Sequence, residues 1–293
     1  MGTAWREREV FYADPLAKGA LTMEIRPATE DHIEGIAAAR LSNGPAHDDS
    51  GADAGYCRHL ISDGQLMVAL EAGRVLGFGG AIDVAGARLL SDLFVHRDVQ
   101  GRGVGRQLLA AVMTGAEARY TFASNDPAAL PLYARAGMLA WWPLLSMRGA
   151  AAALPMGGAA AVEASVADAV AYELAVTGHD RTSTYRYWAG RAQSRTVQVL
   201  RGAECIAVAA VHTGEGGTRV EHLVAQPADA LAALAAVAAL FESTHVHVYV
   251  PGCQRLSAAL MERGFSIEET DIFMATSAEV VHPLVQVVHP GLG

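Results

Sequence analysis

The second half of the chain repeats the first at an offset of about 130 residues, and this repeat limits the possible folds more than any other feature. Near its end the first half reads Leu132-Tyr133-Ala134-Arg135-Ala136-Gly137-Met138, and the second reads Leu260-Met261-Glu262-Arg263-Gly264-Phe265, one residue shorter. Earlier, Asp92-Leu93-Phe94-Val95 corresponds to Glu221-His222-Leu223-Val224. Solenoid repeats are much shorter, about 20–50 residues. The 293 residues therefore predict a duplicated domain.

Both halves show the same order of hydrophobic patterns. A short strand and a helix come first, three strands follow, and a helix, a strand, a helix and a last strand complete the set. This order predicts an α/β protein of two tandem domains, each a mixed, mostly antiparallel sheet flanked by helices. We assign the chain as an N-terminal extension (1–22), a first domain (23–149), an Ala/Gly-rich linker (150–161), a second domain (162–280) and a C-terminal tail (281–293).

Composition narrows the classes of partner and the compartment. The net charge of −9 argues against a nucleic-acid binder that neutralises phosphates, and it is compatible with a cationic acceptor such as an amine. The longest apolar run, Ala230 to Phe241, has 12 residues and is too short to span a bilayer. Three widely spaced cysteines and a polar N-terminus predict a cytoplasmic protein. Lys18 is the sole lysine, which we attribute to GC-rich bacterial codon usage.

A glycine-rich segment, Gln100 to Arg106, follows a predicted strand and opens a predicted helix. Glycines let a backbone approach an anion closely, and the free N–H groups of a first helical turn point at it. The spacing fits neither a dinucleotide-binding fingerprint nor a P-loop, because the third glycine and the Gly-Lys-Ser/Thr element are absent. Taken alone, the segment leaves open a phosphate-binding loop or a flexible turn.

Two motifs in order extend this interpretation. Gln100, Gly103 and Gly105 fit Gln/Arg-x-x-Gly-x-Gly/Ala, and Asn125-x-x-Ala128-x-x-x-Leu132-Tyr133-x-x-x-Gly137-Met138 follows downstream. Together they resemble the coenzyme-binding motifs of the GNAT (GCN5-related N-acetyltransferase) superfamily, over about residues 23–148. The resemblance implies two GNAT-like domains, acetyl-CoA as co-substrate and no metal.

The resemblance also implies roles for particular residues. Backbone groups of Phe94 and Val95 would pair with the pantetheine arm as an added strand. Backbone N–H groups of the glycine segment would hold the pyrophosphate, Asn125 would lie near the pantetheine, and Tyr133 would protonate the departing thiolate. The implied coenzyme-binding residues are Phe94, Val95, Gln100, Gly101, Arg102, Gly103, Val104, Gly105, Arg106, Asn125 and Tyr133.

The acceptor amine must lose a proton before it attacks, and Asp92 is the candidate base because it precedes Val95 on the strand that splays in this fold. Asp92 could instead be an ordinary strand residue, solvated or in a salt bridge. Tyr133 could instead be a packing residue. Asp83 and Glu71 are weaker candidates. His245 and His247 share a strand face, but no third metal ligand is evident.

The second half lacks the glycine segment, since Ala225 to Ala230 contains Pro227 and Asp229 and no glycine. We therefore expect a degenerate second copy. The expected function is transfer of an acetyl group from acetyl-CoA to a primary amine of a small molecule or peptide, without nucleic acid or membrane, by a monomer or homodimer. The alternatives are a non-catalytic acyl-CoA sensor and a coenzyme-free structural protein.

Overall fold

The computed structural model describes residues 23–44, 54–214 and 217–293, so the predicted extension at 1–22 lies outside the described residues. The elements of the first half are β1 (Glu24–Pro27), α1 (Ile33–Leu41), α2 (Ala54–Asp63), β2 (Gln65–Glu71), β3 (Arg74–Val84), β4 (Ala87–Val95), α3 (Val104–Val112), β5 (Arg119–Ala123), α4 (Ala129–Arg135) and β6 (Leu139–Ala150). Those of the second half are β7 (Ala160–Glu163), α5 (Val166–Thr177), α6 (Thr182–Gly190), β8 (Ser194–Arg201), β9 (Glu204–Gly214), β10 (Gly217–Ala225), α7 (Ala230–Leu240), β11 (His245–Pro251), α8 (Arg255–Met261), β12 (Ser266–Ala275) and β13 (Val285–Val287).

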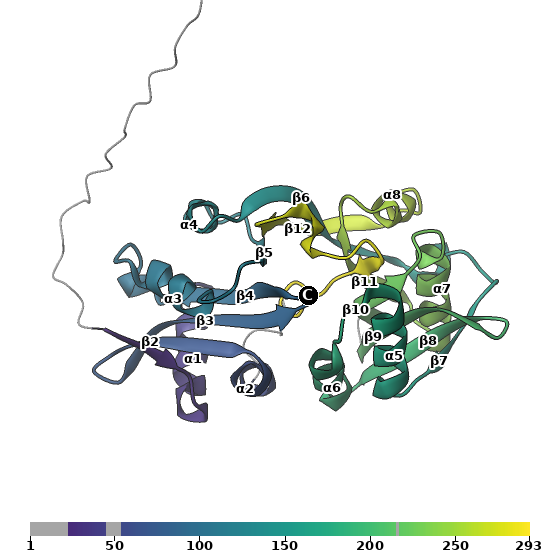
Figure 1. The fold of residues 1–293 in the computed structure, drawn as a ribbon. Coiled ribbons are helices and arrows are strands. Elements are labelled where there is room, and N and C mark those ends of the chain that lie inside the picture. The colour runs from purple at the N-terminus through teal and green to yellow at the C-terminus, as the bar shows by residue number, and fades with distance from the viewer. Residues whose placement is uncertain (1–22, 45–53, 215–216) are drawn as a thin grey trace, which may run out of the picture.

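The strands form one mostly antiparallel sheet with helices on both faces (Figure 1). Its order is β1-β2-β3-β4-β5-β12-β6-β11-β10-β9-β8-β7, with β13 beside β10. Two tight turns build the first meander. Ala72-Gly73 and Ala85-Gly86 each place two successive residues at positive φ, which is the backbone of a type I′ hairpin. The predicted α/β architecture is confirmed.

The two halves exchange their closing strands, which the sequence did not predict. β6, from the first half, pairs with β11 of the second, whereas β12, from the second half, pairs with β5 of the first. β6 and β12 also pair with each other and join the halves across the middle of the sheet, as the teal and yellow strands in Figure 1 show. Trp142 of β6 stacks on Phe273 of β12 with ring centroids 4.1 Å apart. Each half therefore completes the sheet of the other.

Some segments are more ordered than their sequence suggested. The assigned linker contains a 3₁₀ turn (Ala151–Ala153), and the assigned tail contains β13, whose three residues are buried. Helix α6 was not predicted, because its N-cap residue is Arg181, which is not a typical capping residue. The helix is stabilised by tertiary packing of Tyr185 and Trp188, both at most 1% exposed. Within the described ranges, none of the helices combines the length and hydrophobicity that a membrane crossing requires.

A buried ionic network lies inside the second half. Glu173 of α5 is fully buried, with the Arg181 guanidinium 2.8 Å away, His222 Nε2 at 3.1 Å and a hydrogen bond from the Tyr185 hydroxyl at 3.0 Å. Burial alone would raise the pKa of Glu173, but His222 and Arg181 together lower it to about 2. Burial also lowers the pKa of His222, while the Glu173 carboxylate opposes that shift. Arg181 is the permanent counter-charge of Glu173.

Removing this carboxylate should destabilise the protein strongly. We expect Glu173→Gln to lose roughly 3–5 kcal/mol of unfolding free energy at pH 7, because Arg181 stays buried without its counter-charge. The pKa of Glu173 lies below its ordinary value in the folded state. The ionised carboxylate of Glu173 therefore adds to the unfolding free energy above about pH 4.5, and this contribution is lost as the pH falls toward 2. Urea unfolding at several pH values should show the difference between variant and parent narrowing over that interval, whereas a constant difference would contradict the assignment.

Candidate active site

The centre of the first half is a cleft that opens where two parallel strands separate. β4 and β5 pair only through Arg88–Leu90 and Arg119–Thr121. Next, Ser91 is an extra residue in the β3–β4 ladder, since Gly80 faces Asp92 and Ala81 faces Leu90. Such a bulge bends a strand and ends its regular pairing. Beyond it, β4 and β5 diverge and leave Leu93–Val95 without pairing on the β5 side.

The glycine segment forms the start of α3 at the open end of this cleft. Gly101 and Gly103 have φ values of 75° and 82°, and Gly103 is the N-cap of α3. The first hydrogen bond of the helix runs from Gln107 N to Gly103 O, so the preceding N–H groups lack a partner within the helix. A Cβ on Gly101 would meet nothing within 4 Å, which shows how open the surface beside it is. Positive-φ glycines followed by a helix N-terminus make an anion-binding nest.

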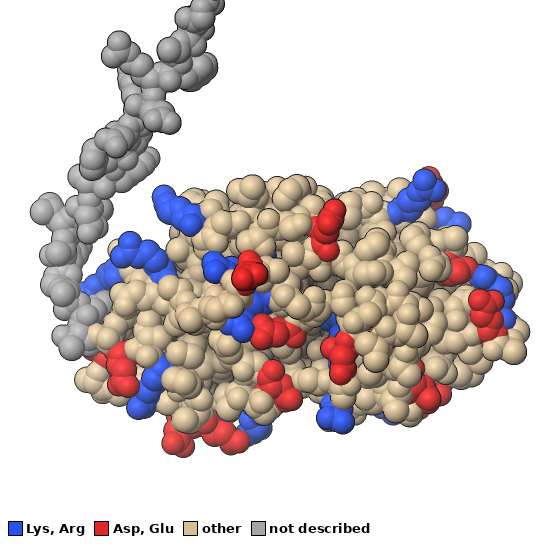
Figure 2. Space-filling view, viewed as in Figure 1, with Lys and Arg blue, Asp and Glu red and all other residues tan. Residues whose placement is uncertain are grey.

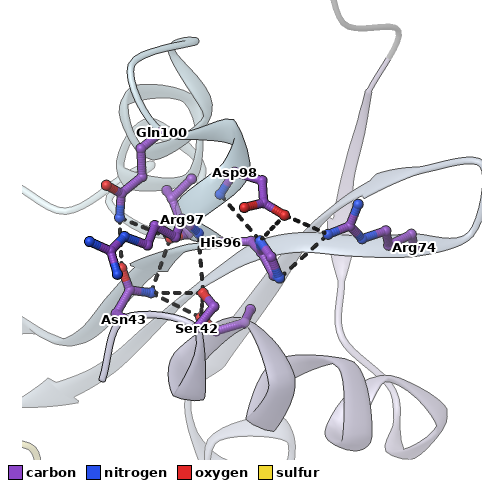
Figure 3. Close-up of polar contacts among 9 residues, drawn as sticks. Ser42, Asn43, Arg74, His96, Arg97, Asp98 and Gln100 are labelled. Carbon is purple, nitrogen blue, oxygen red and sulfur yellow. Dashed lines mark hydrogen bonds and ion pairs between the residues drawn. The ribbon is translucent and has the colours of Figure 1, made fainter. Parts of the chain in front are cut away.

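Side-chain amides tie this loop to the end of β4 (Figure 3). Gln100 Nε2 and Asn43 Nδ2 both donate to Val95 O, at 3.2 and 3.1 Å, and Gln100 also donates to Asn43 Oδ1 at 2.6 Å. Ser42 Oγ accepts from Arg97 N at 3.1 Å. The end of α1 therefore positions both the strand and the loop. Sequence reasoning found Gln100 through its motif but missed Ser42 and Asn43, which carry no local signal.

The cleft opens into a cavity of about 350 Å³. Its walls are β4, β5, α4 and residues of the second half, and the lining includes Asp92, Phe94, Val95, Gln100, Asp126, Tyr133, Tyr249, Glu269, Asp271 and Gly291. Asp92 is partly buried and accepts a hydrogen bond at 2.9 Å from the hydroxyl of Tyr56, a residue of α2 that the sequence analysis did not single out. The structure thus brings together the candidate base, the candidate acid and the two candidate strand residues.

Tyr133 lies on α4 with 7% of its surface exposed. Burial raises the pKa of its hydroxyl well above the ordinary value, and the negative charges of Asp126 and Asp92 add to this. The phenol is therefore protonated at neutral pH, the state that a proton donor requires. The ring of Tyr133 also packs in a buried hydrophobic cluster of the first half.

The other predicted residues are placed less centrally. Arg102 and Arg106 are exposed at the start of α3, and Figure 2 shows basic side chains gathered over that part of the surface. Asn125 does not line the cavity, and its amide donates to Thr270 O of β12 at 3.4 Å. Asp83 forms an ion pair with Arg88 at 2.7 Å, which accounts for its carboxylate structurally. Among the described residues, no group of three or more His, Cys, Asp or Glu side chains could hold a metal ion.

Comparisons with known proteins agree with this geometry. The acetyltransferase (GNAT) domain profile matches residues 62–137, which include the bulge, the glycine segment and Tyr133. A search of curated proteins gives no match. A candidate acetyltransferase from Pyrococcus horikoshii has a similar structure, with a TM-score of 0.71 at 15% identity over 95% of this chain and 97% of its own.

Two other solved structures give the same result. A GCN5-related N-acetyltransferase from Kribbella flavida has a TM-score of 0.59 at 18% identity, covering 86% of this chain and 70% of its own. A tandem GNAT protein from the clavulanic acid biosynthesis pathway has a TM-score of 0.59 at 15% identity, covering 86% and 98%. Residues 62–137 thus match the GNAT acetyltransferase domain, and the chain as a whole shares the fold of these GNAT proteins, one of them a tandem GNAT protein.

Proposed function

We propose that this protein transfers an acetyl group from acetyl-CoA to a primary amine by direct attack. The observation that carries the proposal is the β4–β5 cleft, which leads from an anion-binding helix start to a cavity containing a carboxylate and a buried phenol. Leu93–Val95 lie beyond the β4–β5 pairing and offer a strand edge to the pantetheine arm, and the N–H groups from Gly101 to Arg106 offer donors to the pyrophosphate.

The chemistry needs three proton movements, two away from the nitrogen and one to the sulfur. Asp92, acting through water, takes a proton from the ammonium group, because only the free amine is a nucleophile. The amine nitrogen then bonds to the acetyl carbon as the carbon–sulfur bond breaks, and the nitrogen releases its remaining surplus proton to water, which leaves a neutral amide. Tyr133 donates its proton to the departing sulfur. Asp92 must accept a proton and Tyr133 must donate one. Burial keeps the Tyr133 phenol protonated, and Asp92 accepts a hydrogen bond from the Tyr56 hydroxyl.

The cavity lining favours a cationic acceptor. Four carboxylates, Asp92, Asp126, Glu269 and Asp271, surround it, and two of them come from β12 of the second half. Figure 2 shows several acidic side chains near the middle of the face, with basic side chains beside them. Among the described residues, Arg40 is the one basic residue in this lining, so negative charge predominates, and such a cleft raises the local concentration of cationic ligands. Cytoplasmic location and a monomeric or homodimeric state are part of this proposal.

The test is turnover of acetyl-CoA with a panel of amines, measured as free thiol released together with acetylated amine by mass spectrometry. Acetylation of at least one amine, dependent on Asp92 and Tyr133, is expected. The competing function is an acyl-CoA sensor, in which the same cleft would hold the coenzyme without transfer. Tight coenzyme binding without transfer to any amine would support the sensor and contradict the enzyme.

We expect each chain to bind one acetyl-CoA. In the second half, Pro227 and Asp229 stand where the first half has its glycines, and Asp229 pairs with Arg201 at 2.7 Å just before α7. Proline lacks an N–H group, and a carboxylate at a helix start repels phosphate. Isothermal titration should give a stoichiometry near one. Two equivalent sites would contradict this, as would retained binding after the glycine segment is disrupted.

A further inference from the structure

The second half contains a cleft that matches the coenzyme cleft of the first. β10 and β11 pair in parallel only through Thr218–Val220 and Val246–Val248. The next residue, Glu221, is an extra residue in the β9–β10 ladder, just as Ser91 is in the β3–β4 ladder. The bulges therefore align the halves at an offset of 130, which corrects by one residue the alignment of Asp92 with Glu221. Beyond the bulges, both strand pairs separate.

In the second half, polypeptide fills this opening. We call residues 285–293 the strap. Its strand β13 pairs antiparallel with β10, with Val287 opposite Leu223 and Val285 opposite Val224. On the other side, Val288 N donates to Tyr249 O of β11 at 3.0 Å. The strap thus bridges the separating strands, as an extended ligand arm adds to an open strand edge.

Buried charges hold the strap in place. His289 Nε2 lies 3.7 Å from Glu221 Oε2, and Arg181 donates to the main-chain oxygens of Leu292 and Gly293 at 3.3 and 2.5 Å. Burial alone would raise the pKa of Glu221, but His289 and two arginines, Arg219 and Arg191, lower it below its ordinary value. His289 is 2% exposed. Glu221 and Arg181, two buried charged residues of the second half, therefore contact the strap.

The far end of the strap reaches the cavity of the first half, and Figure 1 shows the C-terminus in the centre of the molecule. Gly291 lines that cavity. Its carbonyl oxygen lies 3.2 Å from the Tyr56 hydroxyl, which donates to Asp92 Oδ2 at 2.9 Å. A Cβ on Gly291 would approach the same hydroxyl oxygen to 3.0 Å. The Tyr56 hydroxyl is therefore confined between the strap and Asp92.

We propose that the strap is the second half's built-in substitute for the coenzyme arm, and that through Tyr56 it positions Asp92 in the cavity of the first half. The second part rests on the proposed function, while the first part does not. The second half would thus hold in place the side of the first-half cavity that contains Asp92, with Tyr56 and Gly291 as positioning residues.

Amide hydrogen exchange tests the first part without any acceptor. In the coenzyme-free protein, a peptide spanning 221–226 should exchange more slowly than the corresponding peptide 91–96. Acetyl-CoA should slow exchange only in 91–96. Val288→Pro removes the N–H that bonds Tyr249 O and should speed exchange in 221–226, whereas Val288→Ala keeps that N–H and controls for lost packing. Equal exchange of the two peptides, or protection of 221–226 by coenzyme, would overturn this part, even if Val288→Pro did not fold.

Kinetics test the second part. Gly291→Ala places a methyl group against the Tyr56 hydroxyl and should displace it, and Tyr56→Phe removes that hydroxyl. Both should lower kcat at least about tenfold while KM for the amine and acetyl-CoA affinity stay within about twofold, because only the orientation of Asp92 changes. Gly190→Ala is the matched control, since its added Cβ would meet nothing within 4 Å. A folded Gly291→Ala variant with full kcat would overturn the positioning role. Absence of turnover in the parent protein would refute the proposed function and this role together, while the exchange result would still stand.

Discussion

Tyr133→Phe is expected to lower kcat by about 10²–10⁴-fold, toward the lower end, and to leave acetyl-CoA affinity nearly unchanged. Phenylalanine keeps the ring and its packing, and only the proton is lost. The lower end is expected because a thiolate is a tolerable leaving group near neutral pH and water can substitute as donor. The measurement is single-turnover acetyl transfer to an accepted amine, together with coenzyme titration.

Tyr120→Phe is the matched control for this prediction. Tyr120 is also a buried tyrosine of the first half, 2% exposed, but it does not line the cavity. Its variant should keep the parent kcat. Full kcat in Tyr133→Phe, where chemistry limits turnover, would make Tyr133 a packing residue. A fall in affinity with unchanged kcat would make the hydroxyl a binding group and move the acid role to water or another side chain.

Gly105→Asp is expected to weaken acetyl-CoA binding by about 100-fold or more while the fold survives. The residue lies in the first turn of α3, where the diphosphate should bind, and two like charges about 4 Å apart near a protein surface repel by about 4 kcal/mol before screening by salt. Gly105 suits the test better than Gly103, whose φ of 82° would add backbone strain to any substitution. At Gly105 a Cβ would meet Val95 Cγ2 at 3.4 Å, an ordinary contact.

Gly105→Asn separates the charge from the size of the side chain. We expect it to bind acetyl-CoA more weakly than the parent but far more tightly than Gly105→Asp. Added salt should narrow the difference, because screening weakens the repulsion. Melting temperatures close to that of the parent would show that both variants fold. Unchanged affinity in folded Gly105→Asp would mean that coenzyme binds elsewhere.

The sequence determined those parts of the site that depend on local chemistry. Gln100 to Arg106 could be identified because positive-φ glycines and a helix start are encoded in neighbouring residues. The order of elements could be predicted for the same reason, since periods of 2 and 3.6 are local. Tyr133 followed from its place in the second motif, and Asp92 from its position on the strand that splays in the fold of the resembled family.

Only the tertiary structure decided what depends on contacts between distant segments. The exchange of β6 and β12 pairs strands of different halves. The sequence could not predict it, because a short apolar strand can pair with many partners. The position of β13, which has three residues, follows from the open edges of β10 and β11 rather than from its own sequence. Tyr56 and Asp271 reach one cavity because chain segments more than 200 residues apart meet there. Local propensity specifies the elements of this protein, and long-range pairing and burial specify which of them share a site.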